Sequence, residues 1–202
     1  MLPQCIYSYQ CPPTFGVRNN VIIGIIAGGD NAVRNSIEGA EDNIEQGWQD
    51  LLSHDISSKD SVLGVTSSGR TPYVVGALKN CVKNNIYTGL ITSNKDTKAE
   101  IYAISTIRTL LGPEVVTGST RMKSGTAQKL ILNMISTTLM IKMGRVKGNK
   151  MVDMMLSNSK LIKRGERFLQ DELGIDSKEA SKLLDRSNSV REAIKLYKKK
   201  EP

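Results

Sequence analysis

Hydroxyl side chains gather around a glycine in the segment "TSSGRTP", which carries Ser67, Ser68, Gly69 and Thr71. Glycine lets the backbone approach a ligand closely, and free N–H groups at the start of a following helix favour an anion. A phosphate or a phosphosugar therefore fits this segment. A turn whose hydroxyls serve only the next helix fits it equally well, and spacing alone does not separate the two readings. The segment matches neither the Walker loop nor the GxGxxG pattern.

A second polar segment, "GSTRMKSGT", places Ser119, Thr120, Arg121 and Lys123 just before a long apolar run. Ser119 and Thr120 can cap a helix that begins there. Arg121 and Lys123 bring positive charge to the N-terminus of that helix, which is unfavourable unless an anion joins them. Local rules are broken most often at functional sites, so we interpret the segment as part of an anion site. The alternative is that both cations extend into water.

Carboxylates are concentrated in "SIEGAEDNIEQG", where Glu38, Glu41 and Glu45 have the spacing of one helix face. Carboxylates that crowd one another have raised pKa values and can act as general acids or bases. A solvated helix face would show the same pattern.

The chain has few of the histidine and cysteine side chains on which other catalytic mechanisms depend. The histidine count is one, His54, so mechanisms built on a Ser–His pair or on several His ligands are excluded. The three cysteines, Cys5, Cys11 and Cys81, form no CxxC pair and are expected to be reduced structural thiols. We expect no metal site and no cofactor.

Alternating strands and helices are expected to position these residues. The run "VIIGIIA" at 21–27 predicts a strand that is buried on both faces. Further strands are predicted at 62–65, 86–93 and, more weakly, 101–107, and helices at 31–52 and from Pro72 onward. This alternation is typical of a doubly wound α/β fold with a parallel sheet.

The pattern becomes purely helical after Pro113. One long helix is predicted from Thr120 to Met143, and its Met and Leu residues on most faces indicate heavy burial. Three more helices are predicted at 149–172, 176–186 and 189–199. The chain therefore reads as an α/β domain at 1–147 followed by a small all-helical region at 148–202.

Composition limits the partners. The chain has 202 residues, 39% of them hydrophobic, which is enough for one good core. The net charge is +8, and most of it lies after residue 144, where fifteen Lys and Arg face nine Asp and Glu. With an aromatic content of 4%, this basic tail is interpreted as solvated helix ends rather than a nucleic-acid surface. No membrane span or signal peptide is recognisable, so we expect a cytoplasmic protein.

Several of these segments together resemble a known family. "CPPTFGV", "IIAGGDNAVRNSIEGAED", "SSGRTPYVVGAL" and "GPEVVTGSTRMKSGTAQKLILNM" resemble the N-acetylmuramic acid 6-phosphate etherases of the sugar isomerase (SIS) superfamily, to which glucokinase regulatory protein is related. The resemblance covers about residues 11 to 160. It implies a homodimeric, cofactor-free lyase that releases D-lactate and N-acetylglucosamine 6-phosphate from its sugar-phosphate substrate by elimination and water addition.

The resemblance also implies residue roles. Glu41 matches one of the family's two acid/base glutamates. The sugar-phosphate loop corresponds to Ser67, Ser68, Gly69 and Thr71, and the segment beside the same pocket to Ser119, Thr120, Arg121 and Lys123.

The chain departs from the family pattern in three places. Gln10 stands at the position of the other acid/base glutamate, and an amide cannot exchange a proton at neutral pH. The leading strand and its Gly-Thr-Ser-Gly-Arg loop are missing, so we expect an N-terminally truncated member. The C-terminal helical region is shorter than the family's. Three hypotheses follow: an etherase that is partial or impaired, a sugar-phosphate-binding regulatory module without turnover, and a nonfunctional remnant.

Overall fold

The computed structural model describes residues 3–187 and 189–199, with side chains from Ser8 onward. Its internal contacts divide the chain into two units. The first contains Gly24–Leu132, and the second contains Ile6–Ile23 together with the chain from Asn133 onward. This division falls within a long helix, and the expected domain boundary after residue 147 stays a prediction.

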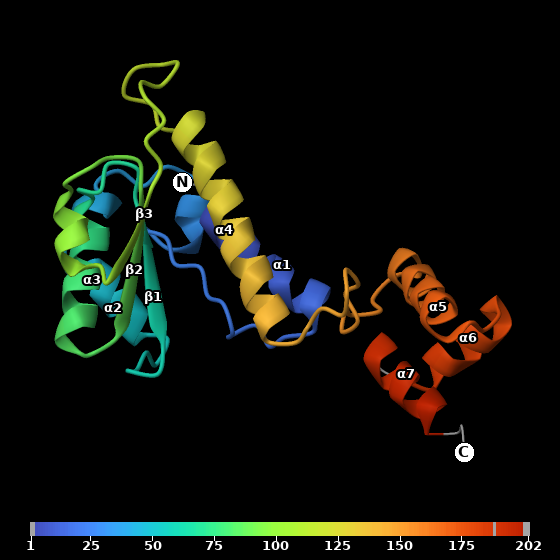
Figure 1. Cartoon of the computed structure of the whole chain (residues 1–202). Helices are drawn as coiled ribbons and strands as arrows, with labels where there is room; N and C mark the ends of the chain where they lie inside the picture. The colour runs from blue at the N-terminus through green and yellow to red at the C-terminus, as the bar shows by residue number, and fades with distance from the viewer. Residues whose placement is uncertain (1–2, 188, 200–202) are drawn as a thin grey trace. The chain divides into compact units, whose positions relative to one another are not determined.

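The first unit is built on a parallel sheet of three strands in the order β1-β2-β3 (Figure 1). The strands are β1 (Ser61–Val65), β2 (Tyr87–Thr92) and β3 (Ser105–Arg108). Val62 is paired with Thr88, and Leu90 with Thr106. The central strand β2 is the most buried, as a parallel strand between two neighbours should be. The α/β fold class with a parallel sheet and a helical C-terminal region is confirmed.

Helix α3 (Pro72–Lys83) packs on this sheet. Leu78 of α3, Leu90 of β2 and Ala99 are completely buried in one cluster. Pro72 lies in the first turn of the helix, where its missing N–H needs no partner. A Cβ at Gly64 would lie 2.9 Å from the Leu78 side chain, so a glycine in β1 allows the helix to approach closely. The predicted helix at this position is confirmed.

Two predictions for the N-terminal part of the first unit are wrong. The apolar run 21–27 forms no strand, because no strand among the described residues pairs with it and an unpaired strand leaves its backbone groups without partners. The single helix predicted at 31–52 is replaced by three short elements. They are η1 (Asp30–Val33), η2 (Ala40–Asp42) and α2 (Gln46–Leu52). Gly39 precedes η2 with a positive φ of 74°, which ends any continuous helix there.

The strand predicted at 101–107 begins four residues later than expected. Lys98–Tyr102 forms the 3-10 helix η3, and the strand pairing starts at Ser105. The strand is therefore short, and it follows η3 after only two residues.

Helix α4 (Lys123–Lys142) confirms the long helix expected from residue 120, but the prediction of heavy burial is wrong. Ile131 and Met140 are buried, whereas Leu130, Met134 and Ile141 are each more than half exposed. In the second unit, Met140 packs with Cys11 and Val17. Cys11 belongs to α1 (Pro3–Phe15), a helix that the sequence did not predict and that has two prolines, Pro12 and Pro13, in its interior.

The second unit also holds three short helices around their own core. They are α5 (Ser159–Leu173), α6 (Ser177–Asp185) and α7 (Val190–Lys198). Each has a polar N-cap whose side chain accepts a backbone N–H, and Leu169, Ala180 and Val190 are fully buried between the helices. No described helix combines the length and the apolar run that crossing a bilayer requires.

An ion pair fastens α7 to the segment before α5. Arg191 donates two hydrogen bonds to the Asp153 carboxylate, at 2.6 and 2.9 Å, and Arg145 lies 3.5 Å from the same group. The bond to Asp153 raises the pKa of the Arg191 guanidinium. Two of the basic residues that follow residue 144 thus form ion pairs inside the second unit.

Candidate functional site

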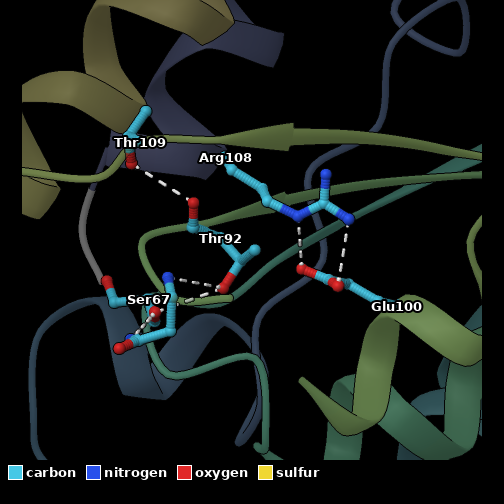
Figure 2. Close-up of polar contacts among 6 residues, drawn as sticks. Ser67, Thr92, Glu100, Arg108 and Thr109 are labelled. Atoms are coloured by element: carbon cyan, nitrogen blue, oxygen red, sulfur yellow. Dashed lines mark hydrogen bonds and ion pairs between the residues drawn. The ribbon is translucent and has the colours of Figure 1, made fainter. Parts of the chain in front are cut away.

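The carboxyl ends of the three parallel strands lie at one edge of the sheet, and a polar loop follows each of them. The loops are 66–71, 93–97 and 109–122. Ligands of α/β proteins bind at this edge of the sheet. Figure 2 shows Ser67, Thr92 and Thr109 near one another there. The first polar segment therefore begins at this edge, and the second lies within a loop that starts there.

The loop after β1 is held in shape by its own hydroxyls. Thr66 is buried, and its Oγ1 lies 2.8 Å from Thr71 Oγ1 and 3.4 Å from Ser68 Oγ. The same oxygen accepts the N–H of Gly69, and Ser68 Oγ accepts the N–H of Arg70. Thr71 is the N-cap of α3 but makes no side-chain cap bond. The reading in which these hydroxyls serve only the helix is therefore disfavoured.

Ser67 connects this loop to two other elements. Its carbonyl accepts the N–H of Ser93, the hydroxyl of Thr92 at 3.2 Å and the side-chain amide of Asn94 at 2.7 Å. Its Oγ accepts a bond of 2.9 Å from the amide of Gln128, a buried residue of α4. Because the Ser67 hydroxyl accepts this bond, its own hydrogen can still be donated to a ligand.

Residues 118–122, which directly precede α4, are exposed apart from Ser119, which is half-buried. Arg121 Nε donates to Ser119 Oγ at 3.1 Å, and Thr120 lies between them. The Lys123 ammonium donates to the carbonyl of Pro113 at 2.7 Å. The Lys123 ammonium therefore hydrogen-bonds within its own loop, whereas the Arg121 guanidinium has further N–H donors that can bind a ligand.

Glu41 lies in η2, which packs against α3. The segment that follows η2 also approaches α3 closely, because a Cβ at Gly76 would come within 1.8 Å of the Ile44 carbonyl oxygen. Glu41 is half-buried. The structure thus places this candidate on an element that is packed directly against α3.

The other carboxylates do not share a helix face with Glu41, because the predicted helix is broken. Glu38 lies before η2 and accepts the hydroxyl of Ser36 at 2.8 Å, and Glu45 is the N-cap of α2. The predicted row of three glutamates on one face is wrong.

Gln10 lies on α1 with an exposed side chain, in the second unit. The other candidate residues up to Lys123 lie in the first unit.

The structure adds polar residues that the sequence analysis missed. Arg108, at the end of β3, makes a bidentate ion pair with Glu100, at 2.9 and 3.1 Å (Figure 2). The hydrogen bond from Arg108 lowers the pKa of Glu100. The pair borders an open hollow of about 520 Å³, which is also lined by Asp96, Thr97, Lys98 and Ile101.

Asn94 and Arg108 lie at the ends of predicted strands, and this position could have identified them from the sequence as candidate site residues. Gln128 had only the signal of an amide in an apolar helix.

The described cysteines do not add a nucleophile. Cys11 and Cys81 are buried thiols, and neither forms a disulfide. Burial raises the pKa of the Cys81 thiol to about 11, so it stays protonated at neutral pH. Among the described residues, no group of three or more His, Cys, Asp or Glu side chains could hold a metal ion.

Comparison with known proteins agrees with this architecture. Residues 10–82 match the family model of the glucokinase regulatory protein N-terminal SIS domain. An N-acetylmuramic acid 6-phosphate etherase of Bacteroides thetaiotaomicron is 54% identical over 94% of this chain and 69% of its own length. Etherases of the same name from Christiangramia forsetii and Caldanaerobacter subterraneus are 53% and 48% identical, over 94% and 92% of this chain and 69% and 61% of their own lengths.

The parallel sheet, the polar loops at its carboxyl edge and the matched domain model define an α/β protein of the SIS class, followed by a helical region. More narrowly, the chain belongs to the N-acetylmuramic acid 6-phosphate etherase family, since it is more than half identical to members of which it covers over two thirds.

Proposed function

We propose that the chain is a carbon–oxygen lyase that cleaves the D-lactyl ether of N-acetylmuramic acid 6-phosphate and releases N-acetylglucosamine 6-phosphate and D-lactate. Family membership supports the substrate. The observation that carries the proposal is the bond between Ser67 and Gln128, because it brings the loop after β1 against the helix that follows Ser119–Lys123.

The sugar phosphate binds at the carboxyl edge of the sheet in this proposal. The phosphate is held by hydroxyls and backbone N–H groups, with Arg121 supplying a positive charge. The binding residues are Ser67, Ser68, Gly69, Thr71, Ser119, Thr120, Arg121 and Lys123.

The reaction needs two proton-transfer groups. A carboxylate removes the proton beside the open-chain aldehyde, a carboxylic acid protonates the departing lactate oxygen, and water then adds to the double bond. We assign one of these roles to Glu41. Gln10, at the place of the second group, cannot transfer a proton because its amide does not titrate.

Incubation of the purified chain with N-acetylmuramic acid 6-phosphate, followed by an enzymatic assay for D-lactate, tests the proposal. D-lactate should accumulate in proportion to the amount of protein. Absence of D-lactate from both the native chain and the Gln10→Glu variant would contradict etherase activity.

The Gln10→Glu variant should turn over faster than the native chain. A restored carboxyl supplies general acid–base catalysis, which contributes on the order of 10²–10⁴-fold to a rate. The measurement is kcat for D-lactate release, and Gln4→Glu, on the same helix, is the control. Equal kcat values for Gln10→Glu and the native chain would show that the missing carboxyl does not limit the rate.

A second function, a sugar-phosphate-binding regulatory module without turnover, is favoured by Gln10 and by the match to a regulatory protein's SIS domain. This function predicts thermal stabilisation by N-acetylglucosamine 6-phosphate without release of D-lactate from the substrate. The two assays together therefore separate the enzyme from the binding module.

We further propose that the chain works as a cytoplasmic homodimer. Several large apolar side chains of α4 are exposed in the single chain, and a second subunit would remove them from water. They are Leu130, Met134, Leu139 and Ile141. Sedimentation equilibrium should give twice the mass of one chain, and Met134→Glu should shift the mass toward the monomer. A native chain that sediments as a monomer at micromolar concentration would contradict the dimer.

A further inference from the structure

The loop between β3 and α4, residues 109–122, is long and contains no regular element, yet it carries Ser119, Thr120 and Arg121. Loops of this length inside compact domains need contacts that fix their shape if they are to hold a ligand. A turn bond from the Ser119 N–H to the Val116 carbonyl shapes the tip of the loop at 3.0 Å. The base of the loop is fixed by other contacts.

Glu114 and Lys123 close the base of this loop by reciprocal contacts. The Glu114 carboxylate accepts the N–H of Lys123 and the N–H of Ser124, both at 2.9 Å. In return, the Lys123 ammonium donates to the carbonyls of Pro113 at 2.7 Å and Leu111 at 3.4 Å. Two side chains thus join the beginning of the loop to the first turn of α4.

Glu114 also resolves the unusual charge pattern at the start of α4. The first turn of α4 contains no acidic residue, although a helix N-terminus favours negative charge. The carboxylate reaches this position from nine residues upstream of Lys123. The N–H groups of Ser124 and Lys123 lower the pKa of the Glu114 carboxyl, so the cap is ionised at neutral pH. The anion expected beside Arg121 and Lys123 is therefore supplied in part by the chain itself.

We propose that Glu114 is a positioning residue of the substrate site: by fastening the base of loop 109–122 to α4, it holds Ser119, Thr120 and Arg121 in the conformation that binds the sugar phosphate. Without this cap, the loop must be ordered by the substrate itself, and the cost of ordering appears as weaker binding. The inference rests on the etherase function proposed above.

The test compares Glu114→Ala and Glu114→Gln with the native chain. Glu114→Ala should raise KM for N-acetylmuramic acid 6-phosphate about tenfold, the size of a lost helix cap, with kcat changed less than about twofold. Glu114→Gln keeps one acceptor oxygen and should recover part of this loss. Binding of N-acetylglucosamine 6-phosphate, measured by calorimetry, should weaken in the same order.

The control is Asp176→Ala, which removes a helix-capping carboxylate from α6 in the second unit. Asp176 accepts the Glu179 N–H at 2.8 Å, so its loss should lower the melting temperature as the loss of Glu114 does, but leave KM unchanged. A stability effect alone would therefore be the same in both variants, whereas the KM effect should belong to Glu114.

The outcomes separate the two proposals. A native chain that binds and turns over the sugar phosphate, with Glu114 variants of native KM and native affinity, would overturn the role of Glu114 alone. If the native chain binds without turnover, the calorimetric affinities decide. A native chain that neither binds nor reacts would overturn both proposals. If Glu114→Ala does not fold, the Gln variant still gives the comparison.

Discussion

Glu41→Gln is expected to lower kcat for D-lactate release by on the order of 10²–10⁴-fold while KM changes little. The amide keeps the shape and the hydrogen-bonding capacity of the side chain but cannot accept or return the proton of the reacting carbon. The assay is steady-state release of D-lactate, in the native chain or in Gln10→Glu, whichever turns over faster. This is the largest loss of activity that we expect from a single substitution.

Glu38→Gln is the matched control. It removes a carboxylate from the same segment, but Glu38 is exposed and already bound to the hydroxyl of Ser36. It should therefore react at the native rate. Equal kcat values for Glu41→Gln and the native chain would remove Glu41 from the proposed mechanism.

Gly69→Ala is expected to have the largest combined effect on stability and ligand binding. Gly69 has a φ of +64°, in the left-handed region that costs a residue with a Cβ about 1–2 kcal/mol. The new Cβ would also lie 2.4 Å from the Thr97 side chain, and such overpacking costs about 1–3 kcal/mol more. We therefore expect a loss of about 2–5 kcal/mol in the free energy of unfolding of the first unit.

Urea unfolding followed by the fluorescence of Trp48 measures this loss, because the single tryptophan lies in α2 of the first unit. Gly112→Ala is the matched control: its φ is +68°, but its Cβ would meet nothing within 4 Å. It should lose only the conformational part, about 1–2 kcal/mol. Equal losses in the two variants would contradict the contact with Thr97. Calorimetry should also show weaker sugar-phosphate binding in Gly69→Ala, because Ser68 and Thr71 must move to make room.

Local patterns predicted the elements that have their partners near in the sequence. Three such elements are consecutive in the chain and pack together: the strand at 62–65, the helix from Pro72 and the strand at 86–93. The apolar face of each is therefore buried against an element that is adjacent to it in the sequence. The helices α6 and α7 were likewise predicted, each within a residue or two. The loop "TSSGRTP" was placed correctly at the end of a parallel strand by the same reasoning.

The predictions that failed depended on partners elsewhere in the chain. An apolar run such as 21–27 has the composition of a strand, but a strand also needs a hydrogen-bonding neighbour, which the sequence pattern does not report. Gly39, with its positive φ, divides the helix predicted at 31–52, and composition alone did not show that this glycine would adopt such a conformation. Glu38, Glu41 and Glu45 therefore do not lie on one helix, and their spacing does not bring their carboxylates onto one face.

The amino-acid sequence by itself determined the family to which this protein belongs and the groups proposed for its site: the hydroxyl and basic segments, the glutamate at position 41 and the amide at position 10. Tertiary structure alone decided how those groups are held. Bonds between residues far apart in the chain, such as Gln128 to Ser67 and Glu114 to the start of α4, form because folding brings the donors of the buried residues Gln128 and Ser124 to their acceptors, and unpaired buried polar groups are costly.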